Sequence, residues 1–248
     1  YGKDKRGKID GNNMHLMNPL IEDRSLLRKR LLAAFNEMQK HPLVLPDKIA
    51  IIGYCFGGLC ALDLARANPS GLKGAISIHG GLTSSEFFQP QAKINASILV
   101  LHGLEDPVVP QETVLSFIDE MTKAEADFQI HCYGHAKHAF TFVGADIPEF
   151  GVKYNEKAHY RSETSIKNFI EEVLGICGND AYAYFQFGID ESTKEKIESL
   201  ILKRNEKFEK EQLIVTFDNV DFINNYNVAK RTLDVANAEL FTAQQSSF

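Results

Sequence analysis

The chain has 248 residues, 44% of them hydrophobic and 24% charged, which suits one globular domain or one domain with an appendage. Its formal net charge of −6 argues against nucleic acid or an anionic membrane surface as a partner. No apolar run approaches the length of a membrane span, and no apolar core follows the basic N-terminus, so we expect neither a membrane partner nor a secretory signal.

Hydrophobic periodicity divides the first 175 residues into helices and strands. Residues 1–20 are polar and turn-rich and are expected to form a loop, and a helix is predicted over 22–40. The first strand is apolar without alternation, which is typical of a parallel sheet buried on both faces. Strands that alternate with helices predict right-handed βαβ units. The predicted strands are Asp47–Tyr54, Gly74–His79, Ser97–His102 and Asp127–Tyr133, and the later helices are Gly58–Asn68, Gln111–Ala124 and 156–174.

The sequence changes character after Gly175. Residues 179–248 contain more Asn and Gln than the preceding part, and they carry no repeat and no chemical motif. A charged helix is predicted over Glu191–Lys210, a short strand over Leu213–Phe217 and another helix over Asn227–Ala243. We interpret 179–248 as a mostly helical accessory segment for packing or oligomerisation.

The stretch from Lys48 to Gly58 combines a buried strand, a Gly-x-Cys-x-Gly turn and the start of a helix. This is the layout of a nucleophile elbow, in which a sharp turn lifts the nucleophile to the N-terminus of the following helix. Gly53 and Gly57 leave room for the turn, and the helix N-terminus favours a thiolate at Cys55. The alternative is a buried cysteine beside glycines that serve only a tight turn.

Three residues with the chemistry of a catalytic triad follow predicted strands: Cys55, Asp106 and His138. The carboxyl ends of parallel strands meet at one edge of a sheet, and the order nucleophile, acid, histidine is that of the α/β-hydrolases. The histidine would take the thiol proton and later deliver it to the leaving group, while the aspartate would fix the imidazole tautomer. The backbone N–H of Phe56 would be one donor of the oxyanion hole.

Other residues compete for these roles or have simpler explanations. His135 is the second candidate for the base, and Asp106 precedes a proline and could only shape a turn. His79 and His102 also end strands, but each precedes a glycine, which favours hydrogen bonding to the backbone. Cys60 lies on the helix after the elbow and is expected in the core.

The four cysteines are Cys55, Cys60, Cys132 and Cys177. They form neither a C-x-x-C pair nor a metal-ligand spacing. A disulfide framework is unusual in a chain of this length, and four scattered thiols are typical of a reducing cytoplasm. We therefore expect a cytoplasmic protein with one reactive thiol.

These motifs together resemble the dienelactone hydrolase family. The resemblance lies in four segments, in the family's order and spacing over about residues 1–175: Gly53-Tyr54-Cys55-Phe56-Gly57-Gly58, His79-Gly80-Gly81-Leu82, Leu101 to Val108, and Tyr133-Gly134 with His138-Ala139-Phe140. A cysteine in place of the usual serine is the most specific of these features. The resemblance implies an α/β-hydrolase fold, no metal or organic cofactor, and hydrolysis of a small ester or lactone through an acyl-cysteine.

The sequence departs from this family in two respects. The family's domain normally begins well upstream, so we expect a sheet without the usual N-terminal strands. The missing part would carry the loop with the second oxyanion donor and a glutamate that activates the thiol. Members that act on dienelactone itself also carry an arginine four residues after the histidine, where this chain has Phe142. Carboxylate recognition by that route is therefore absent.

From these observations we expect an α/β-hydrolase-like domain over 1–175 and an accessory segment over 179–248. Missing strands would leave an apolar strand edge unpaired, and Leu213–Phe217, a second copy of the chain or a partner chain would have to cover it. Two functions stay open. One is a cysteine hydrolase of small esters or lactones, and the other is a hydrolase-like protein without turnover, as a fragment or as a binding or scaffold subunit.

Overall fold

The computed structural model describes residues 14–42, 44–85, 93–175, 183–186 and 213–217. The chain divides into two compact units, 1–23 with 219–248, and 24–218. The element described in the first unit is helix α1 (Met14–Glu22), where the sequence analysis expected a loop. For residues 14–20 that expectation is wrong, because Leu16, Met17, Leu20 and Ile21 recur at helical spacing, which outweighs the neighbouring turn residues. Residues 1–13 lie outside the described residues.

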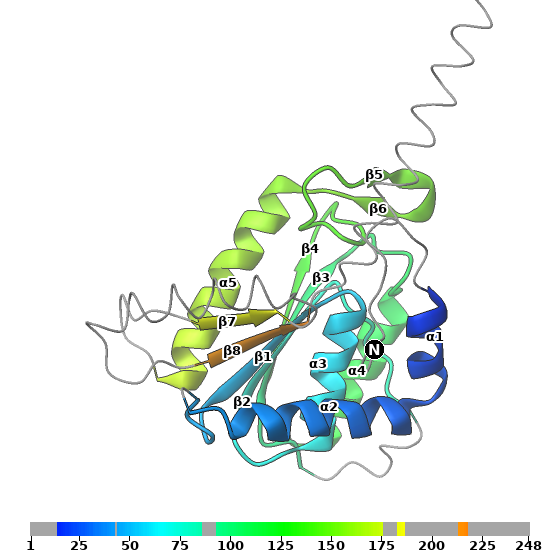
Figure 1. Cartoon of the computed structure of the whole chain (residues 1–248). Coiled ribbons are helices and arrows are strands. Elements are labelled where there is room, and N and C mark those ends of the chain that lie inside the picture. The colour runs from blue at the N-terminus through cyan, green and yellow to red at the C-terminus, as the bar shows by residue number, and fades with distance from the viewer. Residues whose placement is uncertain (1–13, 43, 86–92, 176–182, 187–212, 218–248) are drawn as a thin grey trace, which may run out of the picture. The chain divides into compact units, whose positions relative to one another are not determined.

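The second unit is built on a six-stranded sheet in the order β4-β3-β2-β1-β8-β7 (Figure 1). Every pair of neighbouring strands is parallel. This confirms the predicted α/β class. The strands are β1 (Ile49–Tyr54), β2 (Leu72–Ile78), β3 (Ser97–Gly103), β4 (Phe128–Tyr133), β7 (Ala183–Gln186) and β8 (Leu213–Phe217).

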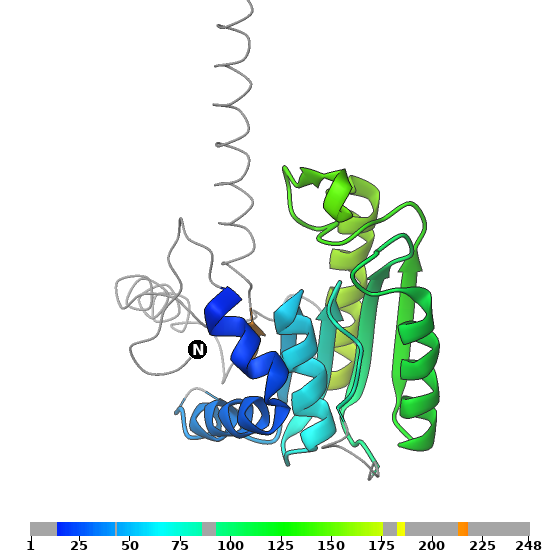
Figure 2. The ribbon, with the colours of Figure 1, turned by 90° about the vertical axis from the view of Figure 1, so that its right-hand side faces the viewer.

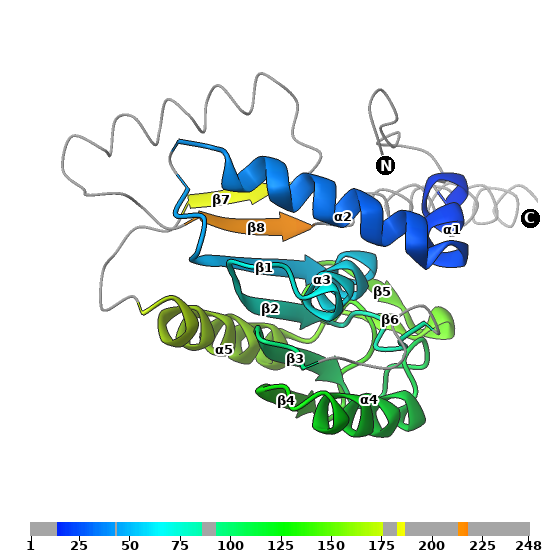
Figure 3. The same cartoon turned by 90° about the horizontal axis from the view of Figure 1, so that it is seen from below.

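Helices cover both faces of this sheet (Figures 1 and 3). Helix α5 (Glu156–Leu174) lies on one face, and α3 (Phe56–Ala67) and α4 (Gln111–Lys123) lie on the other, with α2 (Arg24–Gln39) packed against α3. Side chains alternate between the faces of a strand, so every second residue of the central strands faces α5. The buried cluster on that side includes Ile52, Ile76, Leu99, Phe169 and Ile170. None of the described helices is long and apolar enough to cross a membrane.

Strand β8 pairs with β1, from Ala50 opposite Ile214 to Gly53 opposite Phe217. The sequence analysis named Leu213–Phe217 as one possible cover of this edge, beside a second copy of the chain or a partner chain, and in the structure this segment pairs with β1. Strand β7 was not predicted, and it continues the sheet beyond β8. The predicted helices Glu191–Lys210 and Asn227–Ala243 lie outside the described residues.

A short hairpin that the sequence analysis missed lies beyond the carboxyl ends of β3 and β4 (Figure 2). It consists of β5 (Asp146–Ile147), a 3-10 turn over Pro148–Phe150 and β6 (Val152–Lys153). Two backbone hydrogen bonds connect it to His138: the His138 N–H donates to the Gly151 carbonyl at 2.9 Å, and the Lys153 N–H donates to the His138 carbonyl at 3.1 Å. The backbone of a candidate site residue is therefore part of this small structure.

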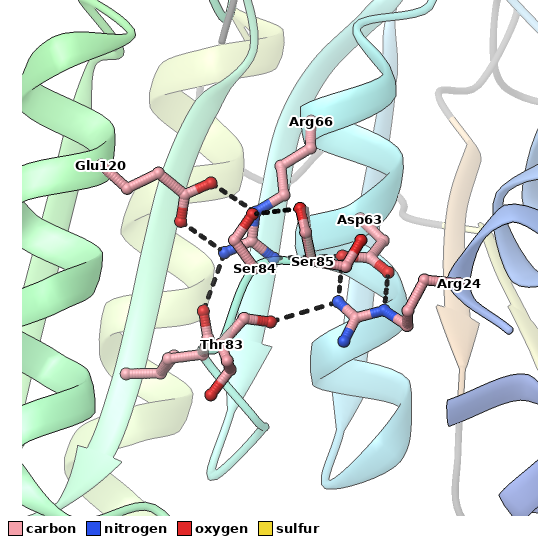
Figure 4. Close-up of polar contacts among 8 residues, drawn as sticks. Arg24, Asp63, Arg66, Thr83, Ser84, Ser85 and Glu120 are labelled. Atoms are coloured by element: carbon pink, nitrogen blue, oxygen red, sulfur yellow. Dashed lines mark hydrogen bonds and ion pairs between the residues drawn. The ribbon is translucent and has the colours of Figure 1, made fainter. Parts of the chain in front are cut away.

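Buried ion pairs connect α3 to the elements around it (Figure 4). The Asp63 carboxylate of α3 accepts hydrogen bonds from Arg24 of α2 at 2.6 and 2.5 Å and from Arg66 at 3.1 Å. Arg66 in turn donates two bonds of 2.8 Å to Glu120 of α4 and one of 2.8 Å to the Leu82 carbonyl. The side chains of Asp63 and Arg66 are fully buried, so each charge depends on its partners.

We expect Asp63→Asn to lower the free energy of unfolding by about 3 kcal/mol, because it leaves two guanidinium groups without their shared carboxylate in a buried site. The control is Glu37→Gln on α2, which removes an exposed ion pair with Lys40. It should leave the free energy of unfolding nearly unchanged. Urea unfolding followed by circular dichroism measures both. Equal stability of the two variants would show that the buried network contributes little.

Candidate active site

Cys55 occupies the turn between β1 and α3 in an uncommon backbone conformation, with φ 52° and ψ −116°. Its N–H donates to the Ile78 carbonyl at 3.0 Å, which fixes the turn to β2. A Cβ at Gly53 would lie 1.9 Å from the Gly57 carbonyl oxygen, so only glycine fits there. A positive φ at a residue other than glycine costs on the order of 1–3 kcal/mol and is frequent at functional sites. The local structure is therefore a strand–turn–helix elbow.

The side chains of Cys55, His138 and Asp106 form a continuous chain of contacts. His138 Nε2 lies 3.2 Å from Cys55 Sγ, and His138 Nδ1–H donates to Asp106 Oδ2 at 2.8 Å. His138 and Asp106 are each 3% exposed, whereas Cys55 is partly exposed. The structure thus brings together the three residues selected from the sequence.

The surroundings of His138 favour its protonated form. Burial acts to lower its pKa, but the hydrogen bonds to Asp106 and Cys55, together with the charges of these two groups, outweigh burial and raise the pKa to about 10. These two acidic neighbours therefore favour an imidazolium at His138. A thiolate at Cys55 is the form that this cation stabilises.

The backbone N–H of Phe56 lies at the N-terminus of α3, directly after Cys55. An amide in the first turn of a helix has no intrahelical acceptor and is available to an anion. This position fits the predicted oxyanion donor. An oxygen bonded to a carbon on Cys55 Sγ would develop its negative charge beside this helix end.

The remaining histidines and cysteines lie in different surroundings. His135 is exposed on a turn with φ 59°, and its Nδ1 is 2.9 Å from Glu105 Oε1. His102 is buried at the end of β3, and burial lowers its pKa. Burial also raises the pKa of Cys60, with Asp63 adding to the effect, and raises that of Cys132. Cys177 lies outside the described residues.

Several contacts that hold the site were missed by the sequence analysis. Asp106 Oδ1 accepts hydrogen bonds from the backbone N–H groups of Val108 at 2.8 Å and Val109 at 3.2 Å. An aspartate followed by a proline is a sequence signal for such a turn, and here the turn and the contact to His138 use the same carboxylate. Here the turn contacts use one carboxylate oxygen, and the other oxygen is bonded to His138.

In the described part of the chain, no group of three or more His, Cys, Asp or Glu side chains could hold a metal ion. A hollow of about 650 Å³ lies between α4 and the segment after β2, lined by residues that include Thr83, Glu112 and Glu120. None of its lining residues belongs to the Cys55–His138–Asp106 group. Its wall is shared with the buried ion network, which favours a structural origin for its acidic side chains.

Comparison with known proteins relates the chain to one family. The model of the dienelactone hydrolase family matches residues 1–174. An uncharacterized protein of Caenorhabditis elegans is 38% identical over 149 residues, which are 60% of this chain and 94% of that protein. A Yersinia pestis protein assigned by name as a carboxymethylenebutenolidase is 34% identical over 100 residues, which are 38% of this chain and 37% of that protein. The chain thus spans little more than a third of this second relative.

A solved structure has the same fold. The dienelactone hydrolase-like promiscuous phosphotriesterase from metagenomic libraries superposes with a TM-score of 0.59 at 34% identity, and the match covers 64% of this chain and 66% of that one. A separate match of 39 residues, 16% of this chain, is 95% identical to part of the cysteine–tRNA ligase of Aliarcobacter butzleri and covers 8% of that enzyme.

The thiols should differ in reactivity. We expect iodoacetamide at neutral pH to modify Cys55 at least about tenfold faster than Cys132, because the imidazolium and the helix N-terminus favour a thiolate at Cys55. Cys132 is the matched control. It is exposed to the reagent, but partial burial raises its pKa and so disfavours the thiolate. Peptide mass spectrometry of the native protein measures both rates. Equal labelling of the two thiols would contradict the assignment.

The pKa of His138 should depend on its contacts with Cys55 and Asp106. In the full chain, nitrogen NMR of the imidazole should show the protonated ring persisting through neutral pH and titrating near a pKa of about 10. Cys55→Ala and Asp106→Asn should each lower this pKa, because each removes a negative charge beside the imidazolium. A wild-type ring that titrates near its ordinary value of 6.5 would mean that the contacts do not stabilise the cation.

Proposed function

Because the chain belongs to the dienelactone hydrolase family, we propose that it hydrolyses a small carboxylic ester or lactone through an acyl-cysteine on Cys55. The observation that carries this proposal is the chain of contacts from Asp106 through His138 to Cys55, at 2.8 and 3.2 Å. The named relatives support the reaction class, since one is assigned by name as a carboxymethylenebutenolidase and another is described as dienelactone hydrolase-like.

The first half-reaction forms the acyl-enzyme. The Cys55 thiolate attacks the carbonyl carbon, a C–S bond forms, and the Phe56 N–H stabilises the negative charge on the carbonyl oxygen. Collapse of this intermediate breaks the C–O bond to the alcohol part of the substrate. His138 Nε2–H gives its proton to that alkoxide, which leaves as an alcohol or, from a lactone, stays attached as a hydroxyl group.

The second half-reaction regenerates the enzyme. Neutral His138 takes a proton from water, and the resulting hydroxide attacks the thioester carbon. Collapse breaks the C–S bond, so that a carboxylic acid leaves and the thiolate–imidazolium pair is restored. Asp106 keeps Nδ1 protonated and the ring in plane through both steps. No further reactant is needed besides water.

The substrate should lack a carboxylate recognised near the histidine. Phe142 stands where members acting on dienelactone carry an arginine, so a negatively charged substrate would find no guanidinium at this position. We propose a neutral small-molecule ester or lactone, without nucleic acid or membrane as a partner. A catalytic thiolate also needs reducing conditions, which agrees with a cytoplasmic location.

Hydrolysis of p-nitrophenyl acetate tests the proposal. The 248-residue protein should release p-nitrophenol, and Cys55→Ala should lose at least about 10³-fold in kcat/KM, because the nucleophile acts only in the chemical step. Cys132→Ser, which changes an exposed thiol on β4, should keep the wild-type rate. If acylation is fast and hydrolysis of the acyl-enzyme is slow, a burst of p-nitrophenol followed by slow turnover would appear.

The alternative function is a hydrolase-like protein without turnover. The observation that favours it is the short match to the relative assigned by name as a carboxymethylenebutenolidase, of which this chain covers 37%. Indistinguishable rates for the wild type and Cys55→Ala would select this alternative. The thiol could still be alkylated in that case, since its ionisation does not depend on completing the reaction.

A further inference from the structure

His79 lies next to the proposed base, and neither the reaction nor the family comparison gives it a role. It directly follows β2, and its backbone has a positive φ of 38°, which is uncommon for a residue other than glycine. The His79 N–H donates to the Leu101 carbonyl at 2.8 Å, so the turn is held against β3. The side chain is buried, and its residue is 4% exposed.

Aromatic rings surround the His79 imidazole. The centroid of the His138 ring is 5.3 Å away at an interplanar angle of 62°, and that of Phe140 is 5.3 Å away at 84°. Tyr54, at the end of β1, is 5.8 Å away. These distances fall within the range of favourable edge-to-face packing. His79 therefore forms one wall of the space in which the His138 ring sits.

One hydrogen bond connects His79 to the loop that carries His138. His79 Nε2 lies 2.9 Å from the hydroxyl oxygen of Thr141, three residues after His138. The other ring nitrogen, Nδ1, has no hydrogen-bond partner within the described part of the chain. The hydrogen bond to Thr141 thus connects the His79 ring, at the end of β2, to the loop after β4.

The His79 ring is neutral. Burial lowers its pKa well below the ordinary value, and the neighbouring His138 charge lowers it further. The titratable groups around it are Tyr54 from β1 and His138 from the loop, with Cys55 and Asp106 beyond His138. A second cation here would repel the His138 imidazolium, whereas a neutral imidazole packs beside it without opposing its charge.

We propose that His79 is a positioning residue for His138, in which a neutral ring packed on the base and bonded to Thr141 keeps His138 Nε2 directed at Cys55 Sγ. This inference rests on the proposed function. Its physical basis is that the 3.2 Å contact between His138 and Cys55 joins two separate segments, and His79, directly after β2, packs on His138 and on Tyr54, which precedes Cys55. A misplacement of about 1 Å at a reacting group can cost about 10²-fold in rate.

Two variants remove the same hydrogen bond from opposite ends. His79→Phe keeps an aromatic ring but has no Nε2, and Thr141→Val keeps the shape of the side chain but has no hydroxyl. Each should lower kcat for p-nitrophenyl acetate by about tenfold to 10²-fold with little change in KM. The double variant should be no worse than the more affected single variant, because both remove one shared contact. Thr141→Ser should restore the wild-type behaviour.

A second readout does not need turnover. The rate of Cys55 alkylation by iodoacetate, an anion that the His138 imidazolium attracts, should fall at high pH as His138 loses its proton. This fall should move to lower pH in His79→Phe and Thr141→Val, because a displaced imidazolium is less stabilised by Cys55 and Asp106. The control is His131→Phe, which removes a histidine–hydroxyl bond of 3.0 Å to Ser165 between β4 and α5. It should not move the profile.

The outcomes separate this inference from the proposed function. A shifted alkylation profile without ester hydrolysis by the wild type would support the positioning role and reject the hydrolase function. An unshifted profile in Thr141→Val, with or without a lower thermal unfolding temperature, would overturn the positioning role and leave His79 as a packing residue. Thr141 is only partly buried, so its valine variant is expected to fold even if His79→Phe does not.

Discussion

The hydrogen bond between Asp106 and His138 is the contact on which the rest of the site depends. It joins the loops after β3 and β4 and is almost completely removed from water. A charge buried in this way is tolerated only when it is paired and hydrogen-bonded. The pairing is reinforced from outside, because Val108 and Val109 bind the second carboxylate oxygen and the hairpin binds the His138 backbone at Gly151. Each loop is thus fixed by its neighbours.

The proposed chemistry depends on a positive charge at His138. An imidazolium at His138 lies between Asp106 and Cys55, so its charge is balanced within the buried site rather than by solvent. The ring beside it, His79, is neutral, which keeps a second cation away from the pair. Because the thiol lies at the N-terminus of α3, the helix end and the imidazolium both favour the same anion.

Stability and function meet in helix α3. Its first turn follows the strained conformation at Cys55, and its body carries Asp63 and Arg66, which bind α2 and α4 through buried ion pairs. A backbone conformation with a positive φ persists only where the surrounding structure determines it. The ion network holds the helix that follows the elbow, so a change at Asp63 would act on the thiol through the position of α3. The buried charges are therefore connected to the site by the helix rather than by direct contact.

Local sequence patterns were enough to predict the elbow at Cys55, the parallel strands and the positions of Asp106 and His138. These patterns are apolar runs, glycines at a crowded turn and polar residues after strands. Features that depend on residues far apart in the chain could be seen only in the fold. His135 and His138 are three positions apart in one loop, and only the fold shows that His138 reaches the thiol. The Asp63 network and the bond from His79 to Thr141 each join segments far apart in sequence. Such contacts leave no periodic trace in the chain, because their partners are chosen by packing in three dimensions.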